Sequence, residues 1–481
     1  MTGHNMSSTA FRTDSRFAAL PAKIRRLPHN ARNMALCALL LVDAGLSAQQ
    51  ALAAVFSAAN ACVTDARSVQ ASRDDTVFLA GALPAVERNL CSELVYGYLR
   101  TEIRIAFVLS RVLPRPQSLP TPLQHVLGLS VYGLLFQDRV PDHAAVHSAV
   151  ETARELYGQG LAKVANGALR SVQRLEGAPR HQEFYTAEGA MAGSLQQLAL
   201  FYSLPVWMIG HWSKYYGAEA VVQLAQRSFD RPWSSLRVNA SHADAQQLRA
   251  GLLACGGAAV GQWGCAFAPG AVPNVVAGKS LADLQLCGAV SYQSAGSQLV
   301  LEQLGLYGWD QPVWDVCAGF GGKTVALLER GVAVPLATDR SFQRLAGLPG
   351  QCSRLALTCP SMALADAANP PIAGWGGHML VDAPCSGLGV LARRPDIRRR
   401  PQQQAVEHEL LQRRILDRLV ALLRPGCELA YITCTLRVQE NEKQIGRVMK
   451  DHPDLRLRCQ WQTPNDHPWL EGMFGAVIRK G

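Results

Sequence analysis

Apolar residues recur every three to four positions over the first third of the chain, the spacing of amphipathic helices. The pattern extends over residues 34–175, where glycine and proline are mostly confined to gaps. It predicts helices at 123–136 and 144–157, separated by a break at 138–142. A further helical stretch covers 194–229. The sequence therefore predicts an all-α amino-terminal region.

The pattern changes after residue 230. Residues 231–239 are typical of a turn followed by a short strand. The chain then becomes rich in glycine and alanine, with short apolar runs around Ala258, Val275 and Val290. This mixture predicts a small α+β module.

From Pro312 onward, apolar runs typical of strands alternate with helical segments. Pro335 falls inside the second run and predicts an irregular or edge strand, because proline has no N–H to donate. The alternation predicts an open parallel α/β sheet, whose ligands bind at the carboxyl ends of the strands. The expected strands are 313–317, 332–338, 378–381 and 428–433, and the clearest helix between them is 405–423.

Length and composition indicate a folded protein with several domains. The 481 residues exceed what one hydrophobic core usually organises, and 48% are hydrophobic whereas 17% are charged. No apolar run is long enough to span a bilayer, so we expect a soluble, cytoplasmic protein. The expected segments are a basic disordered tail at 1–33, a helical domain at 34–180, a linker module at 190–300 and an α/β domain at 301–481.

Charge and cysteine content narrow the function only slightly. The formal net charge of +10 is compatible with a polyanionic partner and equally with an ordinary basic protein. None of the thirteen cysteines forms a C-x-x-C pair, so we expect no metal site. Most of the cysteines are expected to be small buried hydrophobic residues, and a reactive one must be identified by its neighbours.

A glycine-rich turn follows the first strand of the α/β domain and leads into a helix. Its glycines allow the backbone to approach a ligand closely. A P-loop would need glycine at Cys317, and a dinucleotide G-x-G-x-x-G pattern is not completed. A nucleoside-binding turn remains, in which Asp339 at the end of the next strand can accept hydrogen bonds from ribose hydroxyls. The residues of the turn are Asp315, Val316, Cys317, Ala318, Gly319, Phe320, Gly321, Gly322, Lys323 and Thr324.

Two cysteines lie in loops that follow two later strands of the same sheet. Cys385 belongs to the Pro-Cys loop, Asp382-Ala383-Pro384-Cys385-Ser386-Gly387. Cys434 belongs to the Thr-Cys loop, Tyr431-Ile432-Thr433-Cys434-Thr435. Either cysteine alone would more often be a buried structural thiol. Two of them at strand ends of one sheet, at the edge where a cofactor binds, favour a functional role.

In these three loops the chain resembles the RsmB/Sun (Fmu) family of bacterial ribosomal RNA small subunit cytosine-5 methyltransferases, part of the RsmB/NOP group. The resemblance implies a Rossmann-like class I methyltransferase domain that uses S-adenosyl-L-methionine. It implies cofactor contacts from the turn 317–323 and from Asp339, Asp366 and Asp382. It also implies that Cys434 is the nucleophile and that Cys385 assists product release.

The implied reaction explains the need for two thiols and a carboxyl group. Carbon 5 of cytosine is a weak nucleophile, so a thiolate first adds at carbon 6 and generates an enamine whose carbon 5 attacks a methyl donor. Asp382 can supply the acid or hydrogen-bonding group near N3 of the ring. After methyl transfer the proton on carbon 5 must be removed before the nucleophile leaves, and a second cysteine can assist that release.

The rest of the chain resembles the same branch. Segments 93–100, 138–146 and 164–170 are similar to its NusB-like RNA-binding domain, and 231–239 resembles its R-P-x-x-x-L-R-x-N element. That element makes Arg237 and Asn239 candidate contacts to RNA or to the catalytic domain. Basic residues after the Pro-Cys loop are expected to contact RNA phosphates. They are Arg393, Arg394 and Arg398.

The chain departs from the family pattern at Gly319-Phe320, where Ala-Pro is usual, and at Gln293-Ser294, where Gln-Asp is expected. These departures motivate one alternative, an RNA-binding protein of this fold that has lost turnover. A second alternative is an active enzyme with another target, such as transfer RNA. The leading prediction is a monomeric enzyme that forms 5-methylcytosine in 16S ribosomal RNA, either free or in an early assembly particle.

Overall fold

The structure is a computed structural model that describes residues 15–66, 84–137, 141–186, 191 and 193–481. The chain divides into two compact units. Residues 1–206 and 394–399 belong to the first unit, and residues 207–393 and 400–481 to the second. The chain thus passes from the first unit into the second, re-enters the first for six residues and then returns. Among the described residues, no helix is both long and apolar enough to cross a bilayer.

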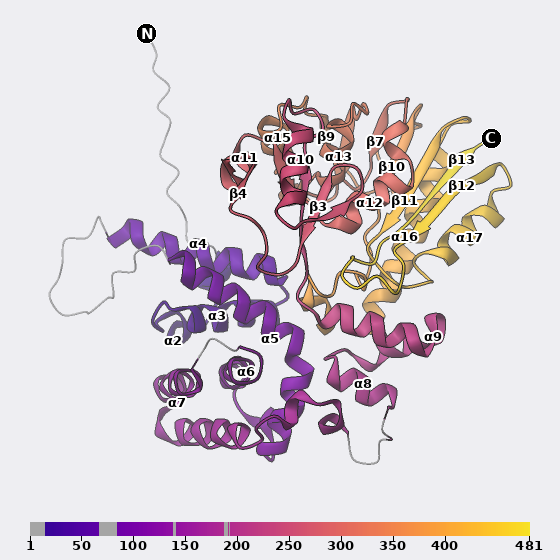
Figure 1. Cartoon of the computed structure of the whole chain (residues 1–481). Coiled ribbons are helices and arrows are strands. Elements are labelled where there is room, and N and C mark those ends of the chain that lie inside the picture. The colour runs from indigo at the N-terminus through magenta and orange to yellow at the C-terminus, as the bar shows by residue number, and fades with distance from the viewer. Residues whose placement is uncertain (1–14, 67–83, 138–140, 187–190, 192) are drawn as a thin grey trace, which may run out of the picture. The chain divides into compact units, whose positions relative to one another are not determined.

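The first unit is helical, as predicted (Figure 1). The predicted end of a helix at residue 157 coincides with a kink in α7, where Gly158 has a φ of 77°. Residues 138–140, which belong to the predicted break and to the NusB-like segment 138–146, lie outside the described residues. The helices are α1 (Ser15–Ala18), α2 (Ala22–Arg25), α3 (Ala31–Asp43), α4 (Ala48–Ala66), α5 (Ala85–Val112), α6 (Thr121–Phe136), α7 (Asp142–Gln173) and α8 (Leu195–Phe201), with 3-10 turns η1 (Pro116–Ser118), η2 (Ala178–Arg180), η3 (Gln182–Tyr185) and η5 (Pro395–Arg399).

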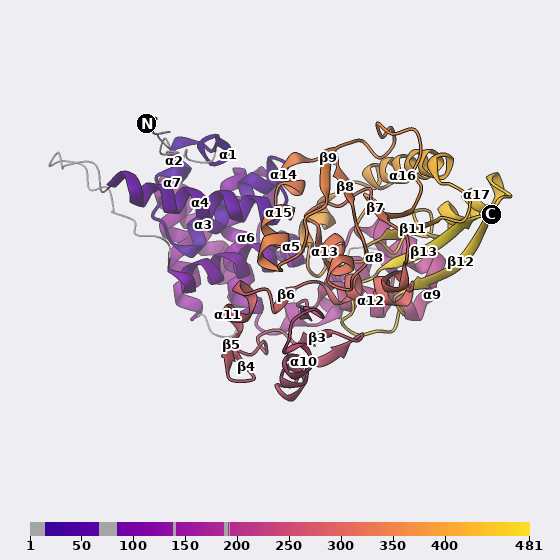
Figure 2. The same cartoon turned by 90° about the horizontal axis from the view of Figure 1, so that it is seen from above.

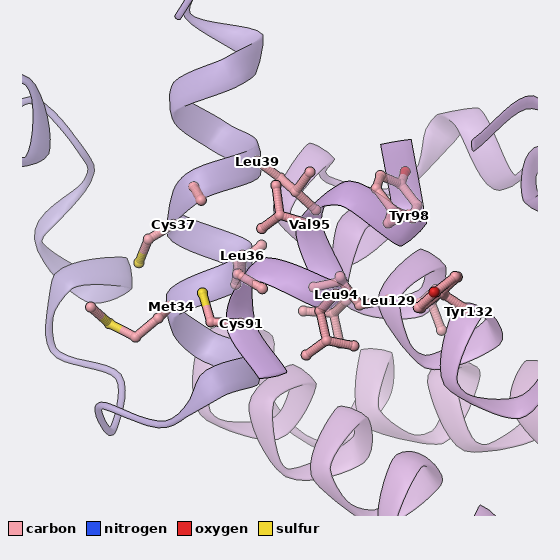
Figure 3. Packing of buried hydrophobic residues seen from close by; sticks show 14 of the residues in the cluster. Met34, Leu36, Cys37, Leu39, Cys91, Leu94, Val95, Tyr98, Leu129 and Tyr132 are labelled. Atoms are coloured by element: carbon pink, nitrogen blue, oxygen red, sulfur yellow. The ribbon is translucent and has the colours of Figure 1, made fainter. Parts of the chain in front are cut away.

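The core of this unit forms where α3, α5 and α6 present their apolar faces to one another (Figure 3). The apolar side chains that Figure 3 labels are each at most 6% exposed, so their packing is the main stabilising contribution of this region. Figure 3 labels Met34, Leu36, Cys37 and Leu39 from α3, Cys91, Leu94, Val95 and Tyr98 from α5, and Leu129 and Tyr132 from α6.

The expected disordered tail at 1–33 is wrong for its second half. Residues 15–30 contain the short helices α1 and α2, and four apolar side chains of this segment are buried in the same core. Helices of four residues show no period in the sequence, which is why the pattern did not predict them. The four buried residues are Phe17, Leu20, Ile24 and Leu27. Residues 1–14 lie outside the described residues.

The six-residue segment 394–399 is packed into the helical unit. Arg398 is 4% exposed and donates through Nη1 to the carbonyl oxygens of Tyr202 at 3.0 Å and Ser203 at 2.8 Å. The neighbouring Arg399 forms ion pairs with Glu102 and Asp43, each at 2.6 Å. A guanidinium that is buried among carbonyl groups is not available to a phosphate, so the expected RNA contact of Arg398 is corrected to a structural role.

The second unit begins with α9 (Val206–Phe229), most of which it contains, and a small module around a four-stranded antiparallel sheet of order β2-β3-β1-β6. The strand predicted within 231–239 is β1, the central strand that pairs with both β3 and β6. The elements are β1 (Ser234–Val238), α10 (Ala245–Ala254), β2 (Ala258–Val260), β3 (Gly264–Phe267), β4 (Val275–Val276), β5 (Lys279–Ser280), α11 (Leu281–Leu286) and β6 (Val290–Tyr292).

A seven-stranded sheet of order β12-β13-β11-β10-β7-β8-β9 follows, and Figure 2 shows it from β9 to the yellow carboxyl-terminal strands. Strands β9, β8, β7, β10 and β11 are parallel, whereas β13 is antiparallel to both of its neighbours. The sheet is therefore mixed rather than wholly parallel. Its strands are β7 (Val313–Asp315), β8 (Leu336–Asp339), β9 (Ser361–Leu364), β10 (His378–Asp382), β11 (Glu428–Thr433), β12 (Leu455–Gln462) and β13 (Phe474–Lys480).

Helices cover both faces of this sheet, as the alternation of side chains along its strands requires. Met379 and Tyr431 pack with α16 and α17, whereas Leu380 and Ile432 pack with α12 and α13 on the opposite face. This confirms the Rossmann-like α/β class. The helices of this part are α12 (Ala295–Gln303), α13 (Gly322–Leu328), α14 (Phe342–Leu345), α15 (Leu348–Arg354), α16 (Gln402–Leu422) and α17 (Glu442–Asp451), with the 3-10 turn η4 (Leu306–Gly308).

The prediction that Pro335 marks an edge or irregular strand is wrong. The strand β8 begins only at Leu336 and lies between β7 and β9, inside the sheet. Pro335 therefore precedes the strand, where its missing N–H costs no ladder bond, and its carbonyl accepts from the amide of Ser361 at 3.0 Å. The edge strand on this side is β9.

Candidate active site

The glycine-rich turn lies between β7 and α13, at the carboxyl end of the sheet. The amide of Ala318 donates to the carbonyl of Thr338, and the amide of Gly319 donates to Oδ2 of Asp339, both at 2.9 Å. Gly321 has a φ of 81°, and a Cβ at this position would lie 2.4 Å from Cδ1 of Leu348. Only glycine fits that backbone and that gap. The turn is thus held against the end of β8.

The departure at Gly319-Phe320 leaves the turn open. A Cβ added at Gly319 or at Gly322 would meet no atom within 4 Å, so the backbone faces free space there. The side chain of Phe320 is 58% exposed, and its carbonyl accepts from the side chain of Gln351. The backbone at these two glycines therefore remains accessible to a ligand.

Carboxyl groups follow the ends of β7, β8 and β9. Asp315 is fully buried, and its Oδ2 accepts from the Thr324 hydroxyl at 2.6 Å. Its Oδ1 has no hydrogen-bond partner among the described residues, and burial raises the pKa of Asp315 to about 7. Asp339 also accepts from the amide of Ser341 at 2.7 Å. Asp366 follows β9 and accepts from the amide of Ala368 at 2.9 Å.

This set of acceptors fits the cofactor that the resemblance implies. S-adenosylmethionine offers ribose hydroxyls and an amino group as hydrogen-bond donors, and buried polar atoms without partners are costly unless a ligand supplies them. The unpartnered Oδ1 of Asp315 and the open backbone of the turn are therefore consistent with a nucleoside ligand. Asp315 belongs to the glycine-rich motif, but the sequence does not predict that it contacts the cofactor.

The two cysteines meet at the ends of adjacent strands. β10 and β11 are parallel and in register, with Asp382 opposite Ile432, so the loops that follow both strands leave the sheet at the same edge. The Sγ atoms of Cys385 and Cys434 are 3.3 Å apart. The structure thus brings together the pair that the strand-end argument singled out.

The environment distinguishes the two thiols. The hydrogen bond from the Cys385 thiol lowers the pKa of Cys434, and the ammonium of Lys323 acts in the same direction. The same hydrogen bond raises the pKa of Cys385 well above its usual value, and burial adds to that effect. Because the thiolate is the nucleophilic form, the environment favours Cys434 as the attacking residue.

Lys323 joins the cofactor turn to the Pro-Cys loop. Its Nζ donates to Oδ2 of Asp382 at 2.6 Å, and the lysine side chain is buried whereas the carboxylate is about one-third exposed. The sequence placed both residues near the cofactor but did not indicate that they form an ion pair. Asp382 is therefore paired with a lysine of the glycine-rich turn.

Glu440 is a buried site residue that sequence reasoning missed. It contacts the backbone amide and hydroxyl of Ser386, directly after Cys385, from a position six residues after Cys434. No spacing rule predicts it, since glutamate is usually exposed and Glu440 lies in the polar run 439–442. The only signal available was its proximity to the Thr-Cys loop.

Arg237 and Asn239 contact protein groups within the second unit. Arg237 is 5% exposed and forms a two-pronged ion pair with Glu329, at 2.7 and 2.9 Å. Asn239 is buried and donates to the carbonyl of Gly288 at 3.2 Å. Of the two alternatives for Arg237, contact with the catalytic domain is therefore the one that the structure supports.

Gln293 also contacts Arg237, since it accepts from the arginine and donates to the carbonyl of Gly322 at 3.1 Å.

Arg237→Ala is expected to destabilise the second unit strongly. The substitution leaves the buried Glu329 carboxylate without its partner, which costs about 3–5 kcal/mol of unfolding free energy. Urea denaturation followed by tryptophan fluorescence measures the loss. Arg413→Ala, which removes an exposed arginine of α16, is the matched control and should change the stability little. Equal losses for the two variants would contradict the structural role of the buried pair.

The remaining two predicted RNA contacts have protein partners but are not buried completely. Arg393 donates to the carbonyl of Trp233 at 2.8 Å and pairs with Glu471 at 2.5 Å, both within the second unit. Arg394 pairs with Asp396 at 3.0 Å, within the segment that belongs to the first unit. Both guanidinium groups are about one-third exposed, so phosphate contact by Arg393 and Arg394 stays a prediction.

Known families match both parts of the chain. The model described as 16S rRNA methyltransferase RsmB/F matches residues 308–469, and the NusB family model matches residues 29–174. The probable ribosomal RNA small subunit methyltransferase B of Bacillus subtilis (strain 168) is 32% identical over 388 residues, 79% of this chain and 84% of that protein. The ribosomal RNA small subunit methyltransferase B of Shewanella oneidensis is 32% identical over 438 residues, 84% of this chain and 95% of that protein.

Solved structures support the same fold. The structure of the protein PH0851 matches with a TM-score of 0.69 at 19% identity, covering 96% of this chain and 99% of its own. A methyltransferase homolog protein from Pyrococcus horikoshii matches with a TM-score of 0.50 at 22% identity, covering 60% of this chain and 100% of its own.

The fold, the glycine-rich turn and the relatives all indicate the same activity, which is methyl transfer. A methyltransferase domain of this class with an open nucleoside-binding turn uses S-adenosylmethionine, and the relatives that span most of the chain are RNA methyltransferases. The protein is therefore an S-adenosylmethionine-dependent RNA methyltransferase. With more than 30% identity over four-fifths of its length, the chain belongs to the family of ribosomal RNA small subunit methyltransferase B.

Proposed function

We propose that the enzyme forms 5-methylcytosine in 16S ribosomal RNA through a covalent adduct between Cys434 and carbon 6 of the target cytosine. The observation that carries this proposal is the pair of thiols 3.3 Å apart beside the cofactor turn, in which Cys434 has the lowered pKa. A direct methyl transfer to a nitrogen would need no thiol, because the nitrogen lone pair can attack the methyl donor by itself. Two thiols of opposite character fit a reaction that must both form and break a carbon–sulfur bond.

The chain supplies each group that the covalent steps need. The Cys434 thiolate adds to carbon 6, the ring electrons move toward N3, and a proton or hydrogen bond at N3 neutralises the charge that develops there. The ion pair of Asp382 and Lys323 lies beside the thiols and is positioned to stabilise this charge. Bound S-adenosylmethionine supplies the electrophilic methyl group that carbon 5 then takes up.

The methylated base is released when the addition of the Cys434 thiolate to carbon 6 is reversed. The proton on carbon 5 leaves to solvent water, the double bond between carbons 5 and 6 re-forms, and the carbon–sulfur bond breaks to return the Cys434 thiolate. We assign Cys385 to this release step because its sulfur lies within contact distance of the sulfur that departs. As a thiol it can donate a hydrogen bond to the leaving thiolate.

The RNA target follows from the relatives, whose names identify small-subunit ribosomal RNA as their substrate. We propose the same RNA for this chain, as free RNA or in an early assembly particle, and hence action in the cytoplasm as a monomer. The NusB-like helical unit is the proposed RNA-binding part. The target cytosine must be unpaired or flipped out of its stack to reach the thiols.

Methyl transfer to defined RNAs tests the proposal. Purified protein is incubated with labelled S-adenosylmethionine and unmodified 16S RNA, assembled small subunits, or transfer RNA, and the product is located by bisulfite sequencing. We expect one 5-methylcytosine in 16S RNA, and more of it in free RNA than in assembled subunits. Methylation of transfer RNA alone would replace the proposed substrate. RNA binding without any product would show that turnover has been lost.

A further inference from the structure

We propose that Glu440 is the positioning residue that holds the two cysteine loops at their working separation, a role that rests on the proposed two-thiol reaction. Glu440 touches no reacting atom. It acts through Ser386 and Gln412, which hold the residues on either side of Cys385.

The carboxylate of Glu440 is hydrogen-bonded to the Pro-Cys loop. It is 0% exposed, and its Oε2 accepts from the backbone amide of Ser386 at 2.8 Å and from Nε2 of Gln412 at 3.0 Å. Its Oε1 accepts from the hydroxyl of Ser386 at 2.5 Å. Nε2 of Gln412 also donates to the carbonyl of Pro384 at 2.9 Å. Residues 384 and 386, which flank Cys385, are therefore both held through this one carboxylate.

The carbonyl of Glu440 and the side chain of Asn441 are hydrogen-bonded to the Thr-Cys loop. The carbonyl of Glu440 accepts from the hydroxyl of Tyr431 at 2.8 Å. The neighbouring Asn441 accepts from the hydroxyl of Thr433 at 2.6 Å and donates to the carbonyl of Thr435 at 2.9 Å. Residues 433 and 435, which flank Cys434, are thus held by the residue next to Glu440.

A direct bond between the loops completes the arrangement. The hydroxyls of Ser386 and Thr435 lie 2.7 Å apart, so the residues that follow the two cysteines also contact each other. Each cysteine is therefore fixed on both sides, and most of the bonds involve residues 440 and 441. A displacement of about 1 Å at a reacting group can reduce a rate about 100-fold, so this rigidity bears directly on the reaction.

Only a carboxylate satisfies this site. The groups that point at the Glu440 oxygens are all donors, and they include Nη1 of Arg437 at 3.4 Å. A carboxylate is purely an acceptor, whereas the amide of glutamine would turn an NH₂ group toward one of these donors. Arg437 is itself buried and supplies the opposite charge that a buried carboxylate needs.

Glu440→Gln is therefore the informative variant, because it keeps the shape and changes only the hydrogen-bonding pattern. We expect the single-turnover rate of methyl transfer to fall about 100-fold at saturating RNA and cofactor. The stoichiometry and affinity of S-adenosylmethionine binding, measured by calorimetry, should stay unchanged, since the turn 317–323 has no hydrogen bond to Glu440. Glu442→Gln, the same change two residues away, is the matched control and should keep the full rate.

The pH profile separates positioning from simple loss of folded protein. The groups that act on Cys434 are Cys385, Asp382, Lys323 and Glu440, and the charge of Glu440 raises the pKa of both thiols. Glu440→Gln should therefore move the midpoint of the rate profile to lower pH while the plateau rate falls. A residue that only supports folding would lower the plateau in step with the amount of protein that binds cofactor, with no shift of the midpoint.

A second variant keeps the test decisive if Glu440→Gln folds poorly. Ser386→Ala removes the hydroxyl bonds to Glu440 and Thr435 but keeps the backbone amide bond, and we expect a smaller loss of the plateau rate. A full plateau rate in both variants would overturn the role of Glu440. Absence of 5-methylcytosine with the unsubstituted enzyme, despite normal cofactor binding, would instead refute the proposed function itself.

Discussion

Cys434→Ala is expected to abolish both the covalent protein–RNA complex and the formation of 5-methylcytosine, with a rate loss of at least about 10⁴-fold. The variant retains the cofactor turn and the Pro-Cys loop but has no sulfur to add to carbon 6. Without that addition carbon 5 stays too weak a nucleophile to be methylated. Cys385 does not replace the missing thiol, because burial and the charge of Glu440 still raise its pKa after the hydrogen bond with Cys434 is lost.

Two measurements check this result. Gel electrophoresis under denaturing conditions detects the covalent complex, and mass spectrometry of digested RNA detects the methylated base. Cys459→Ala is the matched control, because Cys459 is also half-buried but lies in β12, and it should keep full activity. Turnover by Cys434→Ala at more than about one-tenth of the normal rate would refute a nucleophilic role for this residue.

Cys385→Ala is expected to trap the covalent complex. The Cys434 adduct still forms, but its breakdown loses the thiol that lies 3.3 Å from the departing sulfur. The complex should accumulate as a protein–RNA species that resists denaturation, and its breakdown should be slower by about 100-fold or more. Denaturing gels run over a time course give the rate at which the complex forms and the rate at which it breaks down.

Cys385→Ala should also change the pH dependence of adduct formation. The hydrogen bond from Cys385 lowers the pKa of Cys434, so its removal should raise that pKa and shift adduct formation to higher pH. Cys385→Ser is the matched control, because serine keeps a hydrogen-bond donor at this position and should shift the profile less. If instead Cys385→Ala forms no complex and Cys434→Ala accumulates one, the nucleophile is Cys385.

The arrangement of elements was predictable where long segments keep one hydrophobic period. The strand at 428–433 has the predicted bounds, and the helix predicted at 405–423 is α16, Gln402–Leu422. Both are long or strongly apolar, so tertiary contacts reinforce the local pattern. The two short helices within 15–33 were missed because four residues carry no period, and their apolar side chains are stabilised only by the core that they join.

Charged residues were predicted less well than cysteines. Arg398 was predicted to contact RNA phosphates and Arg237 to contact either RNA or the catalytic domain, and both are buried. Their partners lie far away in sequence, Glu329 for Arg237 and the carbonyls of residues 202 and 203 for Arg398. No local pattern reports such pairs, because a buried charge is explained only by a partner that the fold brings to it.

The sequence alone determined that Cys385 and Cys434 follow strands of one sheet, since strand ends can be read from short apolar runs and glycine-rich loops. It also placed the cofactor turn at the same edge, because parallel strands share one carboxyl end. Only the tertiary structure decided that the sulfurs are 3.3 Å apart, that Lys323 pairs with Asp382, and that Glu440 accepts from the backbone amide next to Cys385. These features depend on strand register and on hydrogen bonds between residues that are distant in the chain, and such bonds exist only once the core has packed.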